Sequence, residues 1–181
     1  HLIKIAMLHY QFETIHPFLD GNGRVGRLMI TLYLMENDLL SRPALYLSDY
    51  LEKNRDTYYR HLTEIREKNE IIPWIKFFLK GVILTAENAK NTFIKIIELQ
   101  KEMEIRLRSF GSRAEKINSI INAFYENPIL SVKDIVIKTG IPDKTTRNLL
   151  ELMREDNLIK EMTGYERNKL FIFEKYFNLF K

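Results

Sequence analysis

The chain has 181 residues and no cysteine, 45% of its residues are hydrophobic, and 28 basic and 24 acidic side chains give it a net charge of +4. This length allows one large or two small domains with real cores, and the nearly balanced charge argues against a strongly basic nucleic-acid-binding surface. We expect no membrane span, because no long uncharged apolar run is present, and the lack of thiols excludes disulfides and fits a cytoplasmic protein.

Two helices are predicted at the start of the chain, over residues 2–12 and 22–36, each with apolar residues at helical spacing. The residues expected to face inward are Ile5, Leu8 and Phe12 in the first helix and Leu28, Leu32 and Met35 in the second. The chain begins at His1, inside the first pattern and without an initiator Met, so we expect it to be part of a longer protein.

Residues 16–27, called the signature segment below, read His-Pro-Phe-Leu-Asp-Gly-Asn-Gly-Arg-Val-Gly-Arg. A turn that leads into a helix N-terminus presents free backbone N–H groups, which can bind phosphate. Gly21 and Gly23 allow the backbone to approach a ligand closely, and Asn22 adds an amide donor. The signature segment therefore predicts a phosphate-binding site.

Charged side chains of the signature segment extend this interpretation. Arg24 and Arg27 share a helix face at the positive end of the helix dipole, where a bound anion would stabilise them. Asp20 is a hard oxygen donor beside this positive charge and is suited to Mg²⁺. His16 precedes Pro17, which places it in a loop, and imidazole is suited to act as a base near neutral pH. A base, a metal ligand and an anion site together predict nucleotidyl or phosphoryl transfer.

The signature segment resembles the motif of the Fic (filamentation induced by cAMP) family, His-x-Phe-x-(Asp/Glu)-Gly-Asn-Gly-Arg-x-x-Arg, at every fixed position. The flanking residues 6–15 and 28–30 are also similar to that family. The resemblance implies a protein adenylyltransferase that uses Mg²⁺ and transfers AMP from ATP to a hydroxyl side chain of a target protein (AMPylation).

The resemblance also implies roles for individual residues. His16 would deprotonate the target hydroxyl, Phe18 would anchor the loop in the core, and Asp20 would hold the metal. The implied phosphate ligands are Gly21, Asn22 and Gly23 for the α- and β-phosphates, and Arg24 and Arg27 for the β- and γ-phosphates.

Further helices are predicted after residue 47. They comprise a short helix through Tyr50 and Leu51, a longer one from about residue 56 carrying Tyr59, Leu62 and Ile65, and one or two from Pro73 toward Leu107 that carry Trp74, Phe77 and Phe78. In Fic proteins an aromatic pair that matches Tyr58 and Tyr59 helps to enclose the adenine. Tyrosines at helical spacing also pack in cores, so both interpretations stay open, and Arg66 replaces an Asn that the family often has against the adenine.

A linker is predicted at residues 109–112, dividing the chain into a Fic catalytic core (1–110) and a second domain (111–181). The second domain has predicted helices over 113–125, 131–138 and 143–156, then a β-hairpin with strands 158–162 and 169–173. The expected fold is therefore mainly α, a Fic-type helical core followed by a small winged helix-turn-helix domain.

A winged helix can contact DNA or serve as a protein-interaction module, and both roles stay open here. The possible DNA-binding residues lie at the start of the third helix and in the wing: Lys144, Thr145, Thr146, Arg147, Arg167 and Lys169.

Many Fic enzymes are inhibited by a helix with (Ser/Thr)-x-x-x-Glu-(Gly/Asn), whose Glu pairs with the second arginine, here Arg27. Glu36, Glu87 and Glu126 precede Asn, but none has Ser or Thr four positions earlier. We therefore expect the inhibitory Glu upstream of this chain or on a separate antitoxin chain, and a homodimer is another possible assembly.

The primary interpretation is a protein adenylyltransferase with a winged-helix appendage, with ATP and a target protein as partners. Two alternatives remain. One is a nucleotide-sensing, DNA-binding transcriptional regulator, and the other is an enzyme that transfers another nucleotide or phosphorylated group.

Overall fold

The computed structural model describes residues 1–43, 45–165 and 168–180, and most of them are helical. The only sheet within these ranges is small and antiparallel, and it lies in the C-terminal part of the chain. This arrangement confirms the expected mainly α fold. The chain forms two compact units, residues 1–91 and 92–181.

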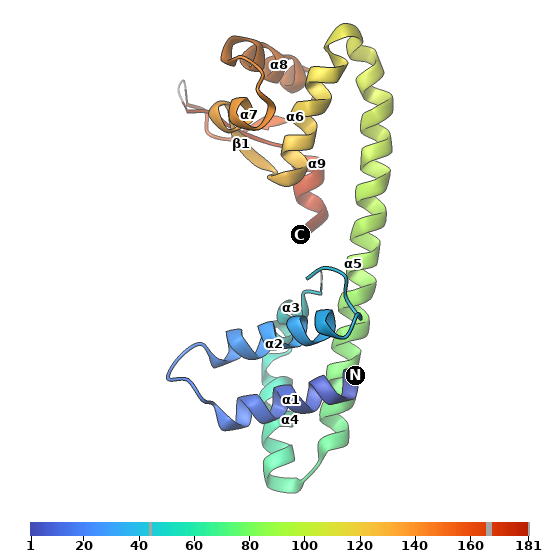
Figure 1. The fold of residues 1–181 in the computed structure, drawn as a ribbon, viewed down its shortest axis with the longest axis vertical. Coiled ribbons are helices and arrows are strands. Elements are labelled where there is room, and N and C mark those ends of the chain that lie inside the picture. Colours follow the sequence, from blue (N-terminus) through green and yellow to red (C-terminus); the bar gives the residue numbers. More distant parts are fainter. Residues whose placement is uncertain (44, 166–167, 181) are drawn as a thin grey trace. The chain divides into compact units, whose positions relative to one another are not determined.

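The first unit is all-helical in its described residues (Figure 1). Its elements are α1 (Leu2–Ile15), α2 (Asn22–Glu36), α3 (Leu47–Lys53), α4 (Arg55–Lys68) and the first part of α5 (Ile71–Leu107). The predicted bounds of α2 are confirmed, and α1 continues three residues beyond its predicted end. The loop between α1 and α2 projects away from the other helices of this unit (Figure 1).

Aromatic side chains of α5 form the centre of the first core. Trp74 and Phe78 are fully buried, and the Trp74 indole N–H donates to the Ala6 carbonyl oxygen at 3.0 Å. This bond ties α5 to α1 and satisfies the one polar group of a buried indole. The aromatic residues that the predicted helix carries, Trp74, Phe77 and Phe78, are thus all buried in this core.

Ile5 of α1 is buried as predicted, but the other residues of α1 and α2 predicted to face inward are exposed or half-buried. The buried residues are Ile5, Ala6 and His9 in α1 and Asn22, Gly26, Ile30 and Leu34 in α2. Leu28 and Leu32 are more than half exposed, and Leu8 is also exposed. Both helices carry apolar residues on more than one face, so the spacing of apolar residues alone does not identify the face that is buried. The close contact between the two helices is made where Gly26 of α2 lies against His9 and Glu13 of α1.

The second unit combines the end of α5 with short helices and strands. Its remaining elements are the 3₁₀ helix η1 (Arg108–Arg113), α6 (Ala114–Glu126), β1 (Ile129–Ser131), α7 (Val132–Thr139), α8 (Asp143–Glu155), β2 (Lys160–Glu161), β3 (Leu170–Ile172), α9 (Glu174–Phe177) and η2 (Asn178–Phe180). The three predicted helices of this region are found within one or two residues of their predicted ends.

The sheet has the order β1-β3-β2, and both pairings are antiparallel. Strand β3 pairs Ile172 with Ile129 of β1 and with Lys160 of β2. The predicted hairpin is therefore present, with shorter strands than expected. Strand β1 was not predicted, because three residues between two helices show no alternation that distinguishes a strand from a turn.

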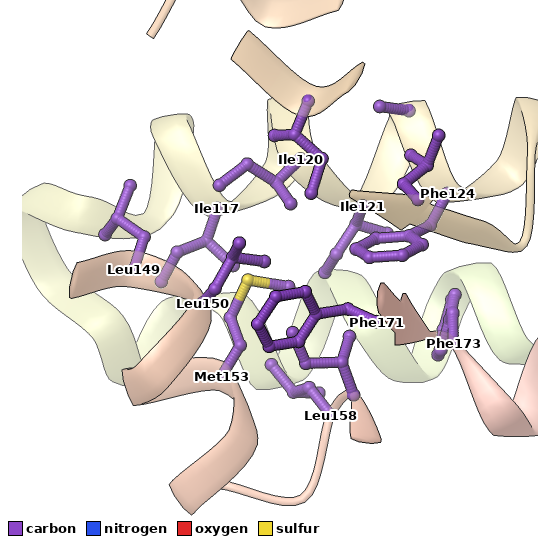
Figure 2. Close-up of a cluster of buried hydrophobic side chains, with 14 of the residues drawn as sticks. Ile117, Ile120, Ile121, Phe124, Leu149, Leu150, Met153, Leu158, Phe171 and Phe173 are labelled. Carbon is purple, nitrogen blue, oxygen red and sulfur yellow. The ribbon is translucent and has the colours of Figure 1, made fainter. Parts of the chain in front are cut away.

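The second core gathers side chains from α6, α8 and the sheet, which point toward one another in Figure 2. Three residues of α5 also belong to it: Leu99, Met103 and Leu107. The two compact units meet at residues 91/92, within α5, while 110/111 stays the domain boundary predicted from the sequence. The predicted linker at 109–112 includes Gly111, whose φ of 53° interrupts the helical backbone of η1.

Each helix among the described residues is too short or too polar to cross a membrane.

Candidate active site

The proposed base lies where α1 ends. His16 follows the last helical residue, its backbone has φ 50° and ψ 58°, and its N–H donates to the Phe12 carbonyl oxygen at 2.9 Å. The left-handed conformation ends the helix and turns the chain into the loop. Because the imidazole is exposed, it can be reached by a substrate.

Asn22 closes the loop between α1 and α2. Its side-chain oxygen accepts from the Phe18 N–H at 2.9 Å, and its amide donates to the Phe18 carbonyl oxygen at 2.6 Å. The Asn22 side chain is buried and makes both of these bonds to the Phe18 backbone. In this structure the Asn22 side chain thus fixes the shape of the loop.

Phe18 does not anchor the loop in the core as expected. Its side chain is 49% exposed, and its ring lies 6.2 Å from that of Phe12 at the end of α1. The reason is the turn at His16, which carries the following residues away from the interface between α1 and α2.

The N-terminus of α2 presents free backbone donors. The first backbone hydrogen bond of the helix joins the Val25 N–H to the Gly21 carbonyl oxygen at 3.0 Å. Within the described part of the chain, the N–H groups of residues 22–24 have no acceptor. Gly21 has a φ of 83°, a conformation that L side chains rarely adopt, so glycine is required to bring the chain into this turn.

Both signature arginines lie back over the glycines of the turn. A Cβ on Gly21 would be 3.4 Å from Nη2 of Arg24, and a Cβ on Gly23 would be 3.3 Å from Nη1 of Arg27. Two guanidinium groups therefore flank the same free N–H groups. Fork-shaped cations beside a helix N-terminus form a site for a polyanion such as a nucleotide triphosphate.

Asp20 is bonded within the turn. One carboxylate oxygen accepts from the Gly21 N–H at 2.7 Å, and the other lies 3.3 Å from Nη2 of Arg24. Both side chains of this ion pair are largely exposed, 93% for Asp20, so the pair is weak and easily opened. No group of three or more acidic or imidazole side chains gathers in the described residues. A single carboxylate together with substrate phosphates is nevertheless a common Mg²⁺ site, so Asp20 fits the implied metal.

The two tyrosines of α4 have different environments. Tyr58 is 6% exposed, its hydroxyl lies 3.1 Å from Nε2 of His9, and its ring is close to that of Trp74. Burial is the main cause that raises the pKa of the Tyr58 hydroxyl. Tyr59 is 51% exposed, with the Arg55 guanidinium 5.7 Å from its ring centre. Tyr58 thus belongs to the core, and only Tyr59 presents an accessible ring.

Three residues in or beside the signature segment were not predicted as site residues: His9, Glu13 and Gly26. Gly26 lies at the contact between α1 and α2, where a Cβ would be 2.6 Å from Oε1 of Glu13 and 3.2 Å from Nδ1 of His9. Both of these polar atoms are buried, and neither has a hydrogen-bond partner among the described residues. Two signals in the sequence pointed here: the spacing of four between His9 and Glu13, and a glycine inside a helix.

Burial changes the protonation of this pair. It lowers the pKa of His9 to about 4, an effect that the Arg27 charge increases and the Gly26 backbone opposes, so the imidazole is neutral at pH 7. Burial raises the pKa of Glu13, whereas the charges of His16 and Arg27 lower it.

The residues proposed for DNA contact are not equally accessible. Thr146 is fully buried, and its hydroxyl donates to the Ile141 carbonyl oxygen at 3.1 Å, so it serves the turn before α8. Lys144 is exposed, and the exposed Arg147 forms an ion pair with Asp143 at 2.6 Å.

Three candidate residues for DNA contact remain, and they also differ in exposure. Thr145 and Lys169 are half-buried, and Arg167 lies outside the described residues.

The comparisons with known proteins agree with this geometry. Residues 1–34 match the model of the Fic/DOC family. "Protein adenylyltransferase Fic" of Drosophila erecta is 27% identical over 129 residues, which cover 67% of this chain and 25% of the relative, and the Drosophila melanogaster protein of that name gives the same values. A "Probable protein adenylyltransferase" of Aquifex aeolicus (strain VF5) is 42% identical over 64 residues, covering 35% of this chain and 18% of the relative.

The chain thus spans about a quarter of the length of the Drosophila relatives that it matches. The matched residues 1–34 contain the complete signature segment, with His16 at its start and Arg27 at its end. The N-terminal part of this chain is therefore similar to the Fic/DOC family over the residues that form the signature segment and its flanks.

Proposed function

We propose that this chain contains the catalytic segment of a protein adenylyltransferase, which transfers AMP from ATP to a hydroxyl side chain of a target protein in the presence of Mg²⁺. One observation carries the proposal: three N–H groups at the start of α2 have no acceptor among the described residues, the guanidinium groups of Arg24 and Arg27 flank them, and the exposed His16 precedes them. The names of the relatives support AMP as the transferred group.

The chemistry follows from these positions. His16 accepts the proton of the target hydroxyl while the hydroxyl oxygen attacks the α-phosphorus of ATP, and pyrophosphate leaves as the bond to the β-phosphate oxygen breaks. Arg24 and Arg27 stabilise the negative charge that develops on the leaving group. Mg²⁺, when bound, neutralises phosphate charge, and Asp20 would hold it after leaving its weak pair with Arg24.

The test incubates the full-length protein with ATP labelled at the α-phosphate, Mg²⁺ and a cell lysate. We expect labelled target protein with the wild type and none with His16→Ala. The matched control is His61→Ala, a histidine of α4 that pairs with Glu64 away from the signature segment. Because the inhibitory element is expected on another segment or chain, the assay is repeated with inhibitor removed. Absence of labelling in both conditions contradicts the proposal.

A second experiment tests the metal ligand. Asp20→Asn keeps the size of the side chain and removes its charge, so we expect a higher Mg²⁺ concentration for half-maximal transfer. An unchanged Mg²⁺ dependence removes Asp20 from the metal site.

The identity of the transferred group is tested with other labelled substrates. Protein labelled from ATP that carries its label at the γ-phosphate would favour phosphate transfer, and protein labelled from another nucleotide would favour transfer of that nucleotide.

We also propose that the second unit is a winged helix. Its order of elements, α6-β1-α7-α8-β2-β3, with β3 central in the sheet, supports this assignment. A DNA-binding role predicts that Lys144→Ala weakens retention of a DNA library, with Lys133→Ala of α7 as the control. A sequence-specific complex that His16→Ala does not change, together with no AMP transfer, would favour the transcriptional regulator.

A further inference from the structure

One face of α5 carries a short sequence repeat. The pattern Ile-x-x-x-Glu-x-x-Lys-x-x-x occurs twice in succession and is closed by a third isoleucine. The residues of this pattern, called the α5 repeat below, are all exposed: Ile83, Glu87, Lys90, Ile94, Glu98, Lys101 and Ile105. The isoleucines are 11 residues apart, which is about three turns of an α-helix, so the α5 repeat stays on one face of the helix.

This face points away from the residues that α5 buries. Met103 and Leu107 belong to the second core, and each is two residues from Ile105. Gly81 is also buried, and it is two residues before Ile83. Residues two apart on an α-helix point about 200° from each other around its axis. The α5 repeat therefore lies opposite to these buried positions.

The exposed isoleucines are unusual for a helix face that meets only water, because such a face is normally polar. The three are between 44% and 67% exposed, and the neighbouring Ile97 is exposed as well. The Glu and Lys side chains of the α5 repeat form no hydrogen bond or ion pair within the part of the chain that the structure describes. An apolar stripe bordered by unpaired charges is typical of a face that another helix covers.

The spacing of the isoleucines fits a second copy of the same helix. We consider two α5 helices side by side and antiparallel, related by a two-fold axis at Ile94. Ile94 then faces Ile94 of the second copy, and Ile83 lies level with Ile105 of that copy, because both are 11 residues from the axis. The apolar positions of the two copies thus coincide along the whole repeat.

The charges of the α5 repeat select this antiparallel orientation. In the same register Glu87 lies level with Lys101 of the second copy, and Lys90 lies level with Glu98. A parallel pair in register would instead place each Glu beside the same Glu and each Lys beside the same Lys. Opposite charges across a helix pair favour association, and like charges oppose it.

We propose that the α5 repeat is a dimerisation surface, and that its occupant is the same face of a second copy of this chain in antiparallel orientation. The isoleucines supply the apolar contact, and the Glu–Lys pairs fix orientation and register. This dimer does not depend on AMP transfer, so it can be tested without any assay of activity.

The first experiment measures the dimer dissociation constant of the chain by sedimentation equilibrium. Ile94→Glu places two like charges at the two-fold axis, so we expect the dissociation constant to rise at least about tenfold. The matched control is Ile137→Glu, which changes an isoleucine of α7 that is 71% exposed and lies outside the α5 repeat. It should leave the dissociation constant unchanged. A chain that stays monomeric up to about 100 µM overturns the proposal, and so does equal dimerisation of the wild type and Ile94→Glu.

The second experiment tests the orientation with introduced cysteines, since the natural chain has none. Ile94→Cys should form a disulfide-linked dimer under mild oxidation, because this position faces its own copy. An equilibrated mixture of Ile83→Cys and Ile105→Cys should form linked heterodimers, whereas either variant alone should not link. Linked dimers of Ile83→Cys alone, at the yield found for Ile94→Cys, would indicate a parallel pair and overturn the antiparallel assignment.

Discussion

At the scale of single residues, His9 shows how a buried polar group links stability to pH. Its imidazole is completely buried, its Nε2 lies 3.1 Å from the Tyr58 hydroxyl, and its Nδ1 lacks a partner among the described residues. Folding lowers the pKa of His9 from 6.5 to about 4. At pH values between these two, His9 therefore binds a proton in the unfolded chain but not in the folded chain.

The expected result is that His9 makes the folded chain less stable as the pH falls from 6.5 toward 4, by at most about 1.4 kcal/mol per pH unit. Glu13 acts in the opposite sense, because its raised pKa contributes stability that is lost as the pH rises. Urea unfolding of Glu13→Gln at pH 4 to 7 therefore isolates the His9 effect. The same slope in a variant that also carries His9→Asn would contradict this assignment.

Gly26 and Gly23 allow a matched test of close packing. Gly26→Ala places a Cβ 2.6 Å from a buried carboxylate oxygen and 3.1 Å from the His9 ring, so we expect a loss of about 1–3 kcal/mol in the free energy of unfolding. Gly23→Ala meets only the end of the flexible Arg27 side chain at 3.3 Å. Because alanine has a better helix propensity than glycine, we expect Gly23→Ala to be as stable as the wild type or slightly more stable. Equal effects of the two substitutions in urea unfolding would refute the steric argument.

At the scale of elements, the start of α7 illustrates a structure set by local sequence. The Ser131 hydroxyl accepts from the Asp134 N–H at 3.2 Å, and the Asp134 carboxylate accepts from the Ser131 N–H at 2.9 Å. These bonds form a capping box, which satisfies two backbone donors at the helix start. The bonds from Ser131 also lower the pKa of Asp134.

Ser131→Ala should therefore destabilise the second unit by about 1 kcal/mol, because the cap is lost. The control is Ser119→Ala in the middle of α6, where the hydroxyl donates only to the Glu115 carbonyl oxygen and alanine is the better helix former. The midpoint of urea unfolding, followed by circular dichroism, should fall for Ser131→Ala alone. Equal shifts for both variants would argue against the cap.

Helices α1 and α2 show the opposite case, since their positions were predicted correctly but only Ile5 of the residues expected to face inward is fully buried. Leu28 and Leu32 have the spacing of a core face, yet the contact is made through Gly26 and the neighbouring Ile30. Apolar periodicity identifies a helix well, but it does not choose between two apolar faces. The choice depends on which face allows the helix axes to approach.

At the scale of the whole molecule, each compact unit has its own hydrophobic core. Leu99, Met103 and Leu107 of α5 contribute to the second core, where Met103 is only 2% exposed. A fragment of residues 92–181 should therefore unfold cooperatively, whereas one of residues 111–181, cut at the boundary predicted from sequence, loses these side chains and should melt at a lower temperature. Calorimetry measures the melting temperatures of the two fragments, and the longer fragment with Met103→Ala should melt at an intermediate temperature. Equal melting temperatures would place the α5 residues outside this core.

The sequence by itself determined the mainly α class, the positions of most helices and the signature segment, because helical periodicity, turn residues and a motif of fixed spacing are local properties. Tertiary structure alone decided that Tyr58 is buried beside His9 while Tyr59 is exposed, and that Glu13 of α1 lies over Gly26 of α2. Each of these depends on how closely two helices approach. The distance between two helices depends on the side chains of both, so it cannot be predicted from the sequence of either segment alone.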